Sequence, residues 1–150
     1  MKEAELPVRV KQLSVFLENR KGSLAAMAQL LGGSGINMLA LSIAETDNFG
    51  ICRLIVSNAE EGVRILRAAG YTVRITEVLV VCVPDRPNGL AEVLRMMEHE
   101  DISVEYLYSF VRNSGYNALI IFRLSDIGRA ERLCEEKGVK TLSKDEVEAL

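Results

Sequence analysis

The chain has 150 residues, of which 49% are hydrophobic and 26% are charged, and its formal net charge is −3. This balance is typical of a folded globular protein and argues against disorder. No dense cluster of Lys and Arg marks a nucleic-acid-binding surface, and the longest strongly apolar run, residues 78–83, is far too short to span a bilayer. We therefore expect no nucleic-acid partner and no membrane partner.

The first residues are charged and contain no apolar signal-peptide core, which predicts a cytoplasmic location. The three cysteines, Cys52, Cys82 and Cys134, include no C-x-x-C pair, so we interpret them as packing residues in a reducing compartment. His99 is the only histidine and is interpreted as a solvated residue at a helix end. A lone histidine without Cys or His partners gives no structural zinc site, and we expect neither a metal nor a cofactor.

The chain begins with a short lead of residues 1–8, and the alternation of apolar and polar residues then predicts a strand at residues 9–17. A polar loop over residues 18–22 leads into a helix from Ser23 to about Leu31, with Ser23 either as the N-cap or just inside the first turn. This helix is indicated by the spacing i, i+3, i+4, i+7 of its apolar residues, which are Leu24, Met27, Ala28 and Leu31. Glycines at 32, 33 and 35 end it.

Two strands, a second helix and a further strand follow. The strands at residues 36–46 and 51–57 are joined by a turn formed by Asp47, Asn48 and Gly50. Asn58 is the expected N-cap of a helix at residues 59–69 that Gly70 ends. The strand at residues 71–75 then runs almost without a break into another at residues 78–83. Because no Gly-, Pro- or Ser-rich linker intervenes, we expect the two halves to share one continuous sheet.

The same unit of strand, loop, helix and strand returns 66 residues later. The apolar strand residues Leu13, Val15 and Leu17 correspond to Leu79, Val81 and Val83, and the helix residues Leu24, Met27, Ala28 and Leu31 to Leu90, Val93, Leu94 and Met97. Ile36 and Leu41 correspond to Ile102 and Leu107. The order and spacing indicate a duplication, with one domain at residues 1–76 and a second at residues 77–150.

The second half repeats the element order of the first. After a loop at residues 84–89 we expect a helix at 90–100, a strand at 102–111, a turn at 113–115 and a strand at 116–124. Asp126 caps a helix that extends to Lys137 and ends at Gly138, and a short strand follows at residues 139–142. Ser143 with Glu146 forms a capping box for a terminal helical turn.

Each half thus reads β-α-β-β-α-β, which predicts the α+β class with two tandem ferredoxin-like sandwiches, their sheets side by side and the helices on one face. The opposite face must be covered or polar. Tyr106, Tyr108 and Phe110 alternate along one strand and are interpreted as core or inter-domain packing. They are also candidates for covering an open face in a homodimer or larger assembly, which we expect the protein to form.

The loops that precede the first helix of each half are candidate ligand sites. A helix N-terminus presents free backbone N–H groups and favours a negative group such as a carboxylate. Asn19 and Asn37 offer donors and acceptors, and Glu18 or Asp85 can pair with an ammonium group. The same residues are equally compatible with ordinary turns and a solvated strand start.

The segments Leu13–Leu24 and Gly35–Met38, repeated around Asp85-Arg86-Pro87, resemble the ACT domain, a small ligand-binding regulatory module, in two tandem copies that cover nearly the whole chain. The second copy departs from the family pattern at Asn88-Gly89, where Gly comes one place late, and at Ser103, where Asn is common. The resemblance implies a non-catalytic protein that binds a free amino acid between two such domains and acts on its own assembly or on a separate metabolic enzyme.

The resemblance also implies which residues bind. They are Asn19, Arg20, Lys21, Gly22, Ser23, Leu24, Asn37, Met38, Asp85, Arg86, Pro87, Asn88, Gly89, Leu90, Ser103 and Val104. In the family arrangement, residues 19–24 would face Ser103–Val104 and residues 85–90 would face Asn37–Met38. The second pairing is expected to be the tighter site, because the Asn37 amide can bond both polar ends of an amino acid.

Two other functions are compatible with the predicted fold. An acylphosphatase-like hydrolase would use Arg20 or Arg86 to hold a phosphate, but it needs a glycine-rich cradle and neither loop is rich in glycine. An RNA-binding module would need paired aromatic residues on the central strands and basic loops. The first half offers only Phe16 there.

Overall fold

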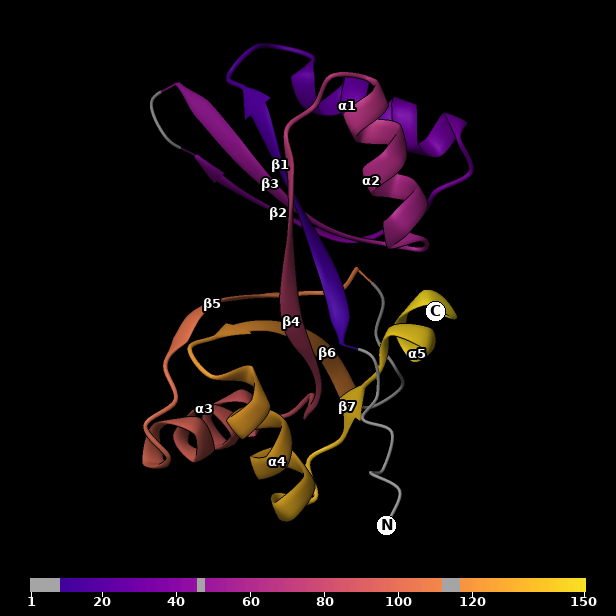
Figure 1. Cartoon of the computed structure of the whole chain (residues 1–150). Coiled ribbons are helices and arrows are strands. Elements are labelled where there is room, and N and C mark those ends of the chain that lie inside the picture. The colour runs from indigo at the N-terminus through magenta and orange to yellow at the C-terminus, as the bar shows by residue number, and fades with distance from the viewer. Residues whose placement is uncertain (1–8, 46–47, 112–116) are drawn as a thin grey trace.

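The computed structural model describes residues 9–45, 48–111 and 117–150 (Figure 1). The predicted lead at residues 1–8, Asp47 of the first predicted turn and the second predicted turn at residues 113–115 lie outside this part of the chain. Within it, every predicted helix and strand is present.

The first half contains β1 (Val10–Glu18), α1 (Ser23–Gly33), β2 (Met38–Glu45), β3 (Phe49–Val56) and α2 (Ala59–Ala68). The two strands predicted at residues 71–75 and 78–83 form a single strand, β4 (Val73–Pro84), which belongs to both halves. The second half continues with α3 (Gly89–His99), β5 (Val104–Ser109), β6 (Asn117–Leu124), α4 (Ile127–Lys137), β7 (Thr141–Leu142) and α5 (Lys144–Glu148).

All strands join one antiparallel sheet in the order β2-β3-β1-β4-β6-β5, and β7 pairs with β4 outside this path. Residues 73–78 of β4 pair with β1, and residues 79–84 of the same strand pair with β6. The prediction of one continuous sheet is confirmed, and β4 is the joint between its two parts. The domain boundary predicted between residues 76 and 77 lies inside this strand.

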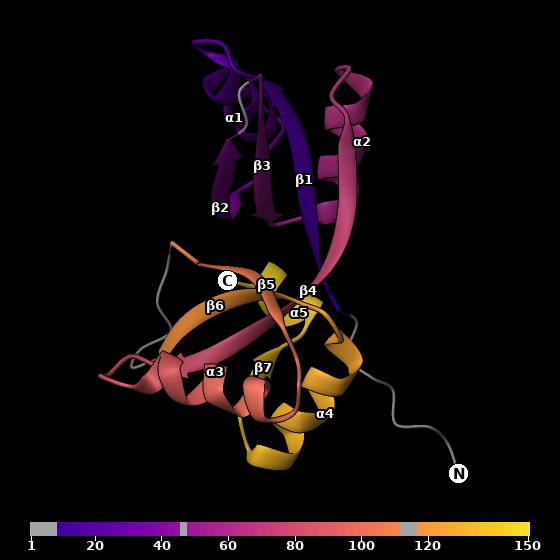
Figure 2. The same cartoon turned by 90° about the vertical axis from the view of Figure 1, so that its left-hand side faces the viewer.

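Each half buries its own core between its helices and one sheet face. Helices α1 and α2 cover one face of the first half, and α3 and α4 cover one face of the second (Figures 1 and 2). The predicted strand positions supply both cores: Leu13, Val15 and Leu17 pack in the first, and Leu79, Val81 and Val83 pack in the second. The helix residues that meet them include Met27 and Leu31 in α1 and Val93 and Met97 in α3. The chain therefore has the α+β fold of two tandem ferredoxin-like units.

A third core lies between the halves. The sheet curls at β4, so the faces that carry no helices turn toward each other (Figure 2). Leu39 and Ile55 from the first half pack with Val80, Phe110 and Ile121 from the second, and α5 adds Val147. This packing confirms the interpretation of the aromatic strand as an inter-domain contact.

The aromatic residues of β5 are thus covered within one chain. Phe110 is buried in the third core, and the hydroxyl groups of Tyr106 and Tyr108 both bond Gln12 of β1. The predicted use of these three residues as a cover for a homodimer is therefore wrong, because the curl of the sheet supplies the cover from the same chain. A dimer would need another surface.

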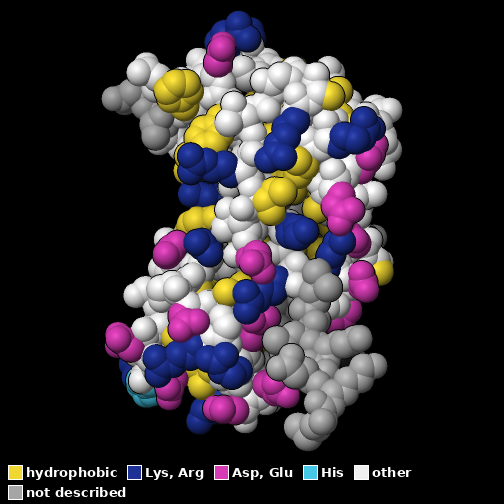
Figure 3. Space-filling view, viewed as in Figure 1, with side chains coloured by type: hydrophobic (Ala, Val, Ile, Leu, Met, Phe, Trp, Pro, Cys, Tyr) yellow, Lys and Arg dark blue, Asp and Glu magenta, His cyan; other side chains and the backbone are white. Residues whose placement is uncertain are grey.

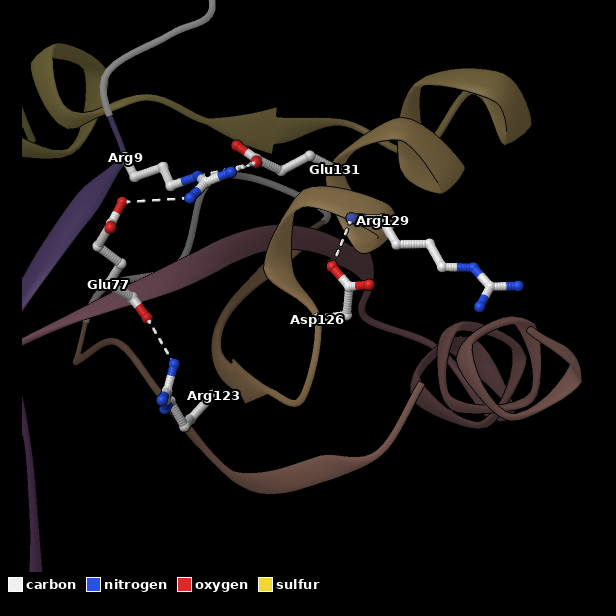
Figure 4. Close-up of polar contacts among 6 residues, drawn as sticks. All are labelled: Arg9, Glu77, Arg123, Asp126, Arg129 and Glu131. Atoms are coloured by element: carbon white, nitrogen blue, oxygen red, sulfur yellow. Dashed lines mark hydrogen bonds and ion pairs between the residues drawn. The ribbon is translucent and has the colours of Figure 1, made fainter. Parts of the chain in front are cut away.

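Ion pairs hold the start of β1 against the second half (Figure 4). The Arg9 guanidinium lies 2.8 Å from the Glu131 carboxylate on α4 and 3.5 Å from that of Glu77 on β4. The Arg123 side chain donates to the Glu77 backbone carbonyl. Because these side chains are partly exposed, each pair contributes at most about 1 kcal/mol, and their main effect is to orient β1 over α4.

The predicted helix caps are confirmed. The side chains of Asn58 and Asp126 accept hydrogen bonds from backbone N–H groups in the first turns of α2 and α4, and Ser143 forms the capping box with Glu146. Ser23 is the first residue of α1, inside its first turn. No helix in the described ranges is long and apolar enough to cross a membrane.

Candidate functional site

The loop between β1 and α1 is open to solvent at the helix N-terminus. Gly22 occupies the N-cap position with a φ of 89°, a left-handed conformation that favours glycine, and no side chain caps the helix. Asn19 and Lys21 are exposed. The Arg20 guanidinium, also exposed, lies 3.0 Å from the Glu18 carboxylate, so this cation is partly neutralised.

The loop between β4 and α3 repeats this geometry with different residues. Asn88 takes the left-handed conformation of Gly22, with a φ of 68°, and α3 also has no side-chain cap. Gly89 is required for another reason, because a Cβ there would lie 2.0 Å from the carbonyl oxygen of Pro84. The one-place shift of the glycine in the second copy therefore has a structural reason. Asn88 adopts the left-handed conformation of the turn, and Gly89 permits the close approach of the α3 start to the Pro84 carbonyl. Arg86 pairs with Glu92 at 3.0 Å.

The two predicted strand starts are also equivalent to each other. The backbone N–H of Asn37 donates to the Ser57 hydroxyl at 2.9 Å, and the backbone N–H of Ser103 donates to the Ser125 hydroxyl at 2.9 Å. The Asn37 and Ser103 residues are exposed, whereas Met38 and Val104 are partly buried and pack against the cores of their own halves. Of these four, the side chains of Asn37 and Ser103 are the more accessible to a ligand.

The structure does not bring the loops and the strand starts together within one chain. The loop before α1 and the loop before α3 lie at opposite ends of the molecule (Figures 1 and 2). Ser103 and Val104 line a hollow with residues of their own half, among them Leu94 and Glu98, and with none from residues 19–24. Within a single chain, neither loop therefore faces the strand start of the other half as predicted, because the curl at β4 turns both loops outward.

The loop before α1 instead borders a cavity within the first half. This cavity has a volume of about 620 Å³, and its lining includes the predicted residues Arg20, Lys21, Gly22 and Ser23. The wall also includes the end of β1 from Phe16 to Glu18, Ala26 of α1, Phe49 of β3 and the turn from Ala69 to Thr72 after α2. Sequence reasoning missed this turn as part of a site. Gly70 was interpreted only as a helix end, and the turn's position beside the loop depends on the pairing of β1 with β4.

The raised pKa values of Cys52, Cys134 and Tyr108 are explained by burial. Burial raises the pKa of the Cys52 and Cys134 thiols to about 11, so both stay protonated, as the packing interpretation requires. Burial also raises the pKa of Tyr108 far above its ordinary value. Among the described residues, no three His, Cys, Asp or Glu side chains are placed to hold a metal ion.

Comparison with known proteins assigns the fold to a family. The model of the family described as an ACT domain pair matches residues 8–150 of this chain. No curated protein matches the chain.

Solved structures share the fold over most of the chain. A crystal structure of a protein from Bacteroides thetaiotaomicron is 34% identical, with a TM-score of 0.90, and the match covers 96% of this chain and 99% of that one. The regulatory subunit of aspartate kinase from Thermus thermophilus is 14% identical with a TM-score of 0.62, and the match covers 89% and 95% of the two chains. The equivalent subunit from Thermus flavus is 12% identical with a TM-score of 0.61, covering 85% and 90%. At these identities the two aspartate kinase subunits show a shared fold.

Proposed function

This chain belongs to the ACT domain family as a pair of ACT domains, and on that premise we propose that it is a non-catalytic regulatory protein that binds a free amino acid. The bound amino acid would alter the chain's contact with another copy or with a separate metabolic enzyme. The regulatory aspartate kinase subunits of similar fold support a role of this kind.

The observation that carries the proposal is the open helix N-terminus beside the cavity of the first half. The first N–H groups of α1 have no side-chain cap, and they lie at the edge of a cavity of about 620 Å³. Such a helix end favours the carboxylate of an amino acid. Lys21 adds a positive charge without an ion-pair partner in the described ranges. The Glu18 carboxylate, which pairs with Arg20 at 3.0 Å, also lines the cavity and could be shared with the ligand's ammonium group.

A second copy of the chain would complete the site. Asn37 and Ser103 are exposed, but neither reaches a loop of the same chain. Strand β2 is an edge of the sheet, and it exposes Leu41 and Ile43 by 38% and 44% on the side of the helices. We propose a homodimer formed along this edge, so that a strand start of one copy meets a loop of the other. A monomeric mass by light scattering at micromolar concentrations would contradict it.

The proposed location is the cytoplasm. All three cysteines are free thiols, and two of them are buried, which agrees with a reducing compartment.

Thermal unfolding with each of the twenty amino acids tests the proposal. A ligand present at about 100 times its Kd stabilises the fold by about 2.7 kcal/mol, which raises the Tm of a chain of this size by roughly 5–10 °C. We expect one amino acid, or a chemically related few, to give such a shift at millimolar concentration. A flat response to all twenty would refute amino-acid sensing.

Site variants then locate the ligand by calorimetric titration. Asn37→Ala is expected to weaken the site that pairs Asn37 with residues 85–90 roughly ten- to a hundred-fold, because a hydrogen bond to a charged ligand group contributes about 1.5–3 kcal/mol. Ser103→Ala should cost less. Gln29→Ala and Ser109→Ala are matched controls, since both residues are exposed and lie outside the proposed site. If Ser103→Ala abolishes binding while Asn37→Ala is silent, the roles of the two strand starts are reversed.

The two alternative functions have direct tests. Hydrolysis of a model acyl phosphate would indicate the acylphosphatase-like reaction. For RNA, the aromatic strand β5 is a weak platform, because Tyr106 and Tyr108 are already bonded to Gln12. On the face in Figure 3, Lys and Arg side chains are spread over both halves among Asp and Glu. We therefore expect no shift in an RNA mobility assay.

A further inference from the structure

A second cavity lies in the other half, between α3 and the turn that joins α4 to β7. Its volume is about 700 Å³. Met96 and Val139 form an apolar part of its wall, and both pack against the core of the second half. Gly89 lies at one end, where α3 begins. The cavity therefore offers an apolar wall next to a helix start.

Cations without partners surround this apolar wall. Arg95, Lys137 and Lys140 all line the cavity, and none makes an ion pair with another residue of the described ranges. The carboxylate that also lines it, Glu92, is already paired with Arg86 at 3.0 Å. A chain with a formal net charge of −3 thus gathers three unneutralised cations around one cavity. An anion bound in this cavity would be attracted by all three side chains.

The first half provides an internal comparison. The N-cap residues Gly22 and Asn88 are 66 positions apart, and the N-cap residues Asn58 and Asp126 are 68 positions apart. These offsets align Arg95 with Gln29, Lys137 with Ala69, and Lys140 with Thr72. Ala69 and Thr72 line the cavity of the first half, so the two cavities occupy equivalent places. All three cations of the second cavity therefore stand where the first half has neutral residues.

We propose that the cavity of the second half binds an organic anion with an apolar body, a ligand different in kind from the amino acid proposed for the loop before α1. Lys137, Lys140 and Arg95 hold the anionic group. Met96 and Val139 contact the apolar body. The tandem pair thus carries two chemically distinct sites, and this proposal does not depend on amino-acid binding.

Four probes separate the contributions of charge and apolar contact. Octanoate and octyl phosphate carry both an anion and an apolar chain, inorganic phosphate carries only the charge, and octan-1-ol carries only the chain. Each is titrated into the full ¹⁵N-labelled chain, and the amide resonances of Gly89 and Gly138 are compared with those of Gly22, the N-cap of α1, and Gly70, the first-half equivalent of Gly138. We expect the two amphiphilic anions to shift Gly89 and Gly138, and the other two probes to have no effect at equal concentration. Whichever of octanoate and octyl phosphate binds with the lower Kd shows whether the cavity prefers a carboxylate or a phosphate headgroup.

Variants at exposed positions complete the test without threatening the fold. Combining Lys137→Gln with Lys140→Gln should weaken octanoate or octyl phosphate binding about tenfold or more, because two of the three cations are lost. Arg132→Gln is the matched control, since Arg132 is also an exposed cation of α4 without an ion pair in the described ranges but lies outside this cavity. Arg95→Gln should weaken binding independently of the lysines.

Three results would overturn the proposal. They are the absence of binding by either amphiphilic anion up to about 10 mM, shifts of equal size at Gly22 and Gly70, or a loss in Arg132→Gln as large as that in the double variant. Amino acids titrated into the same sample report through Gly22, and Gly138, which belongs to neither predicted amino-acid pairing, reports on this cavity alone, so failure of one proposal is distinguishable from failure of the other.

Discussion

Gln12 is expected to be a principal polar contact between the two halves. Its side chain is fully buried on β1 and makes three hydrogen bonds. The amide nitrogen donates to the Tyr106 hydroxyl at 2.8 Å and to the Ser14 hydroxyl at 3.2 Å. The amide oxygen accepts from the Tyr108 hydroxyl at 2.7 Å. Gln12→Leu removes all three bonds while keeping a side chain of similar length, so the loss is mainly polar.

The size of the expected destabilisation follows from the polar groups that the substitution leaves without hydrogen-bond partners. Tyr108 is partly buried and packs against the third core, and its hydroxyl would lose its acceptor on Gln12. A buried polar group left unpaired costs about 1–3 kcal/mol, and each of the other lost bonds about 0.5–1.5 kcal/mol. We therefore expect Gln12→Leu to lower the free energy of unfolding by about 3 kcal/mol, or the Tm by roughly 6–12 °C.

A double-mutant cycle separates this mechanism from a general packing defect. Urea unfolding is measured for wild type, Gln12→Leu, Tyr108→Phe and the combination. Phe has no hydroxyl that Gln12→Leu could leave unpaired. The loss of unfolding free energy in the double variant should therefore be smaller than the sum of the losses in the two single variants, with a coupling energy of about 1 kcal/mol or more. Additive losses, or a change of less than about 0.5 kcal/mol for Gln12→Leu, would refute the network as a contact that holds the halves together.

Two further predictions follow from other parts of the fold. Gly89→Ala should destabilise the chain by about 1–3 kcal/mol in urea unfolding, because the new Cβ would lie 2.0 Å from the Pro84 carbonyl oxygen. The control Gly32→Ala, in α1, should be neutral or stabilising, because a Cβ there would have no atom within 4 Å. Equal effects of the two substitutions would contradict the close approach of Gly89 to Pro84 as the cause. Stability should also decline as the pH rises from about 8.5 toward 11, because burial raises the pKa of Cys52 and Cys134 to about 11 and the unfolded chain loses these protons first. Replacing both cysteines by Ala should flatten this decline, and an unchanged slope would exclude them as its cause.

The elements and the duplication could be predicted because they depend on local patterns. The apolar residues of β1 and of the second part of β4 recur at the same spacing, and Asn58, Asp126 and Ser143 begin helices as their side chains lead one to expect. Continuity of the sheet could also be inferred, since residues 71–83 contain no breaker. Each of these inferences needs only neighbours in the sequence.

Tyr106, Tyr108 and Phe110 could be interpreted as inter-domain packing, but the burial of Gln12 and Ser14 could not be predicted, because it depends on the curl of the sheet. Gln12 and Ser14 alternate with apolar residues, which predicts a solvated face, yet their exposed fractions are 0% and 9%. They are buried because the second half folds over that face and brings Tyr106 and Tyr108 to them. The same curl carries the two candidate loops to opposite ends, so the predicted facing of loop and strand start is not formed within one chain, for the same physical reason.

The shared strand β4 therefore determines where a ligand site can be completed. Its two ends serve different halves, and the third core together with the Gln12 hydrogen bonds fixes the angle between them. With that angle fixed, neither loop can turn to meet the other half's strand start without breaking a buried interface. Strand β2 leaves Asn37 near an edge that another chain can approach. Amino-acid binding of the kind proposed would then be linked to association of two copies, so that a ligand bound between them would favour the dimer by mass action.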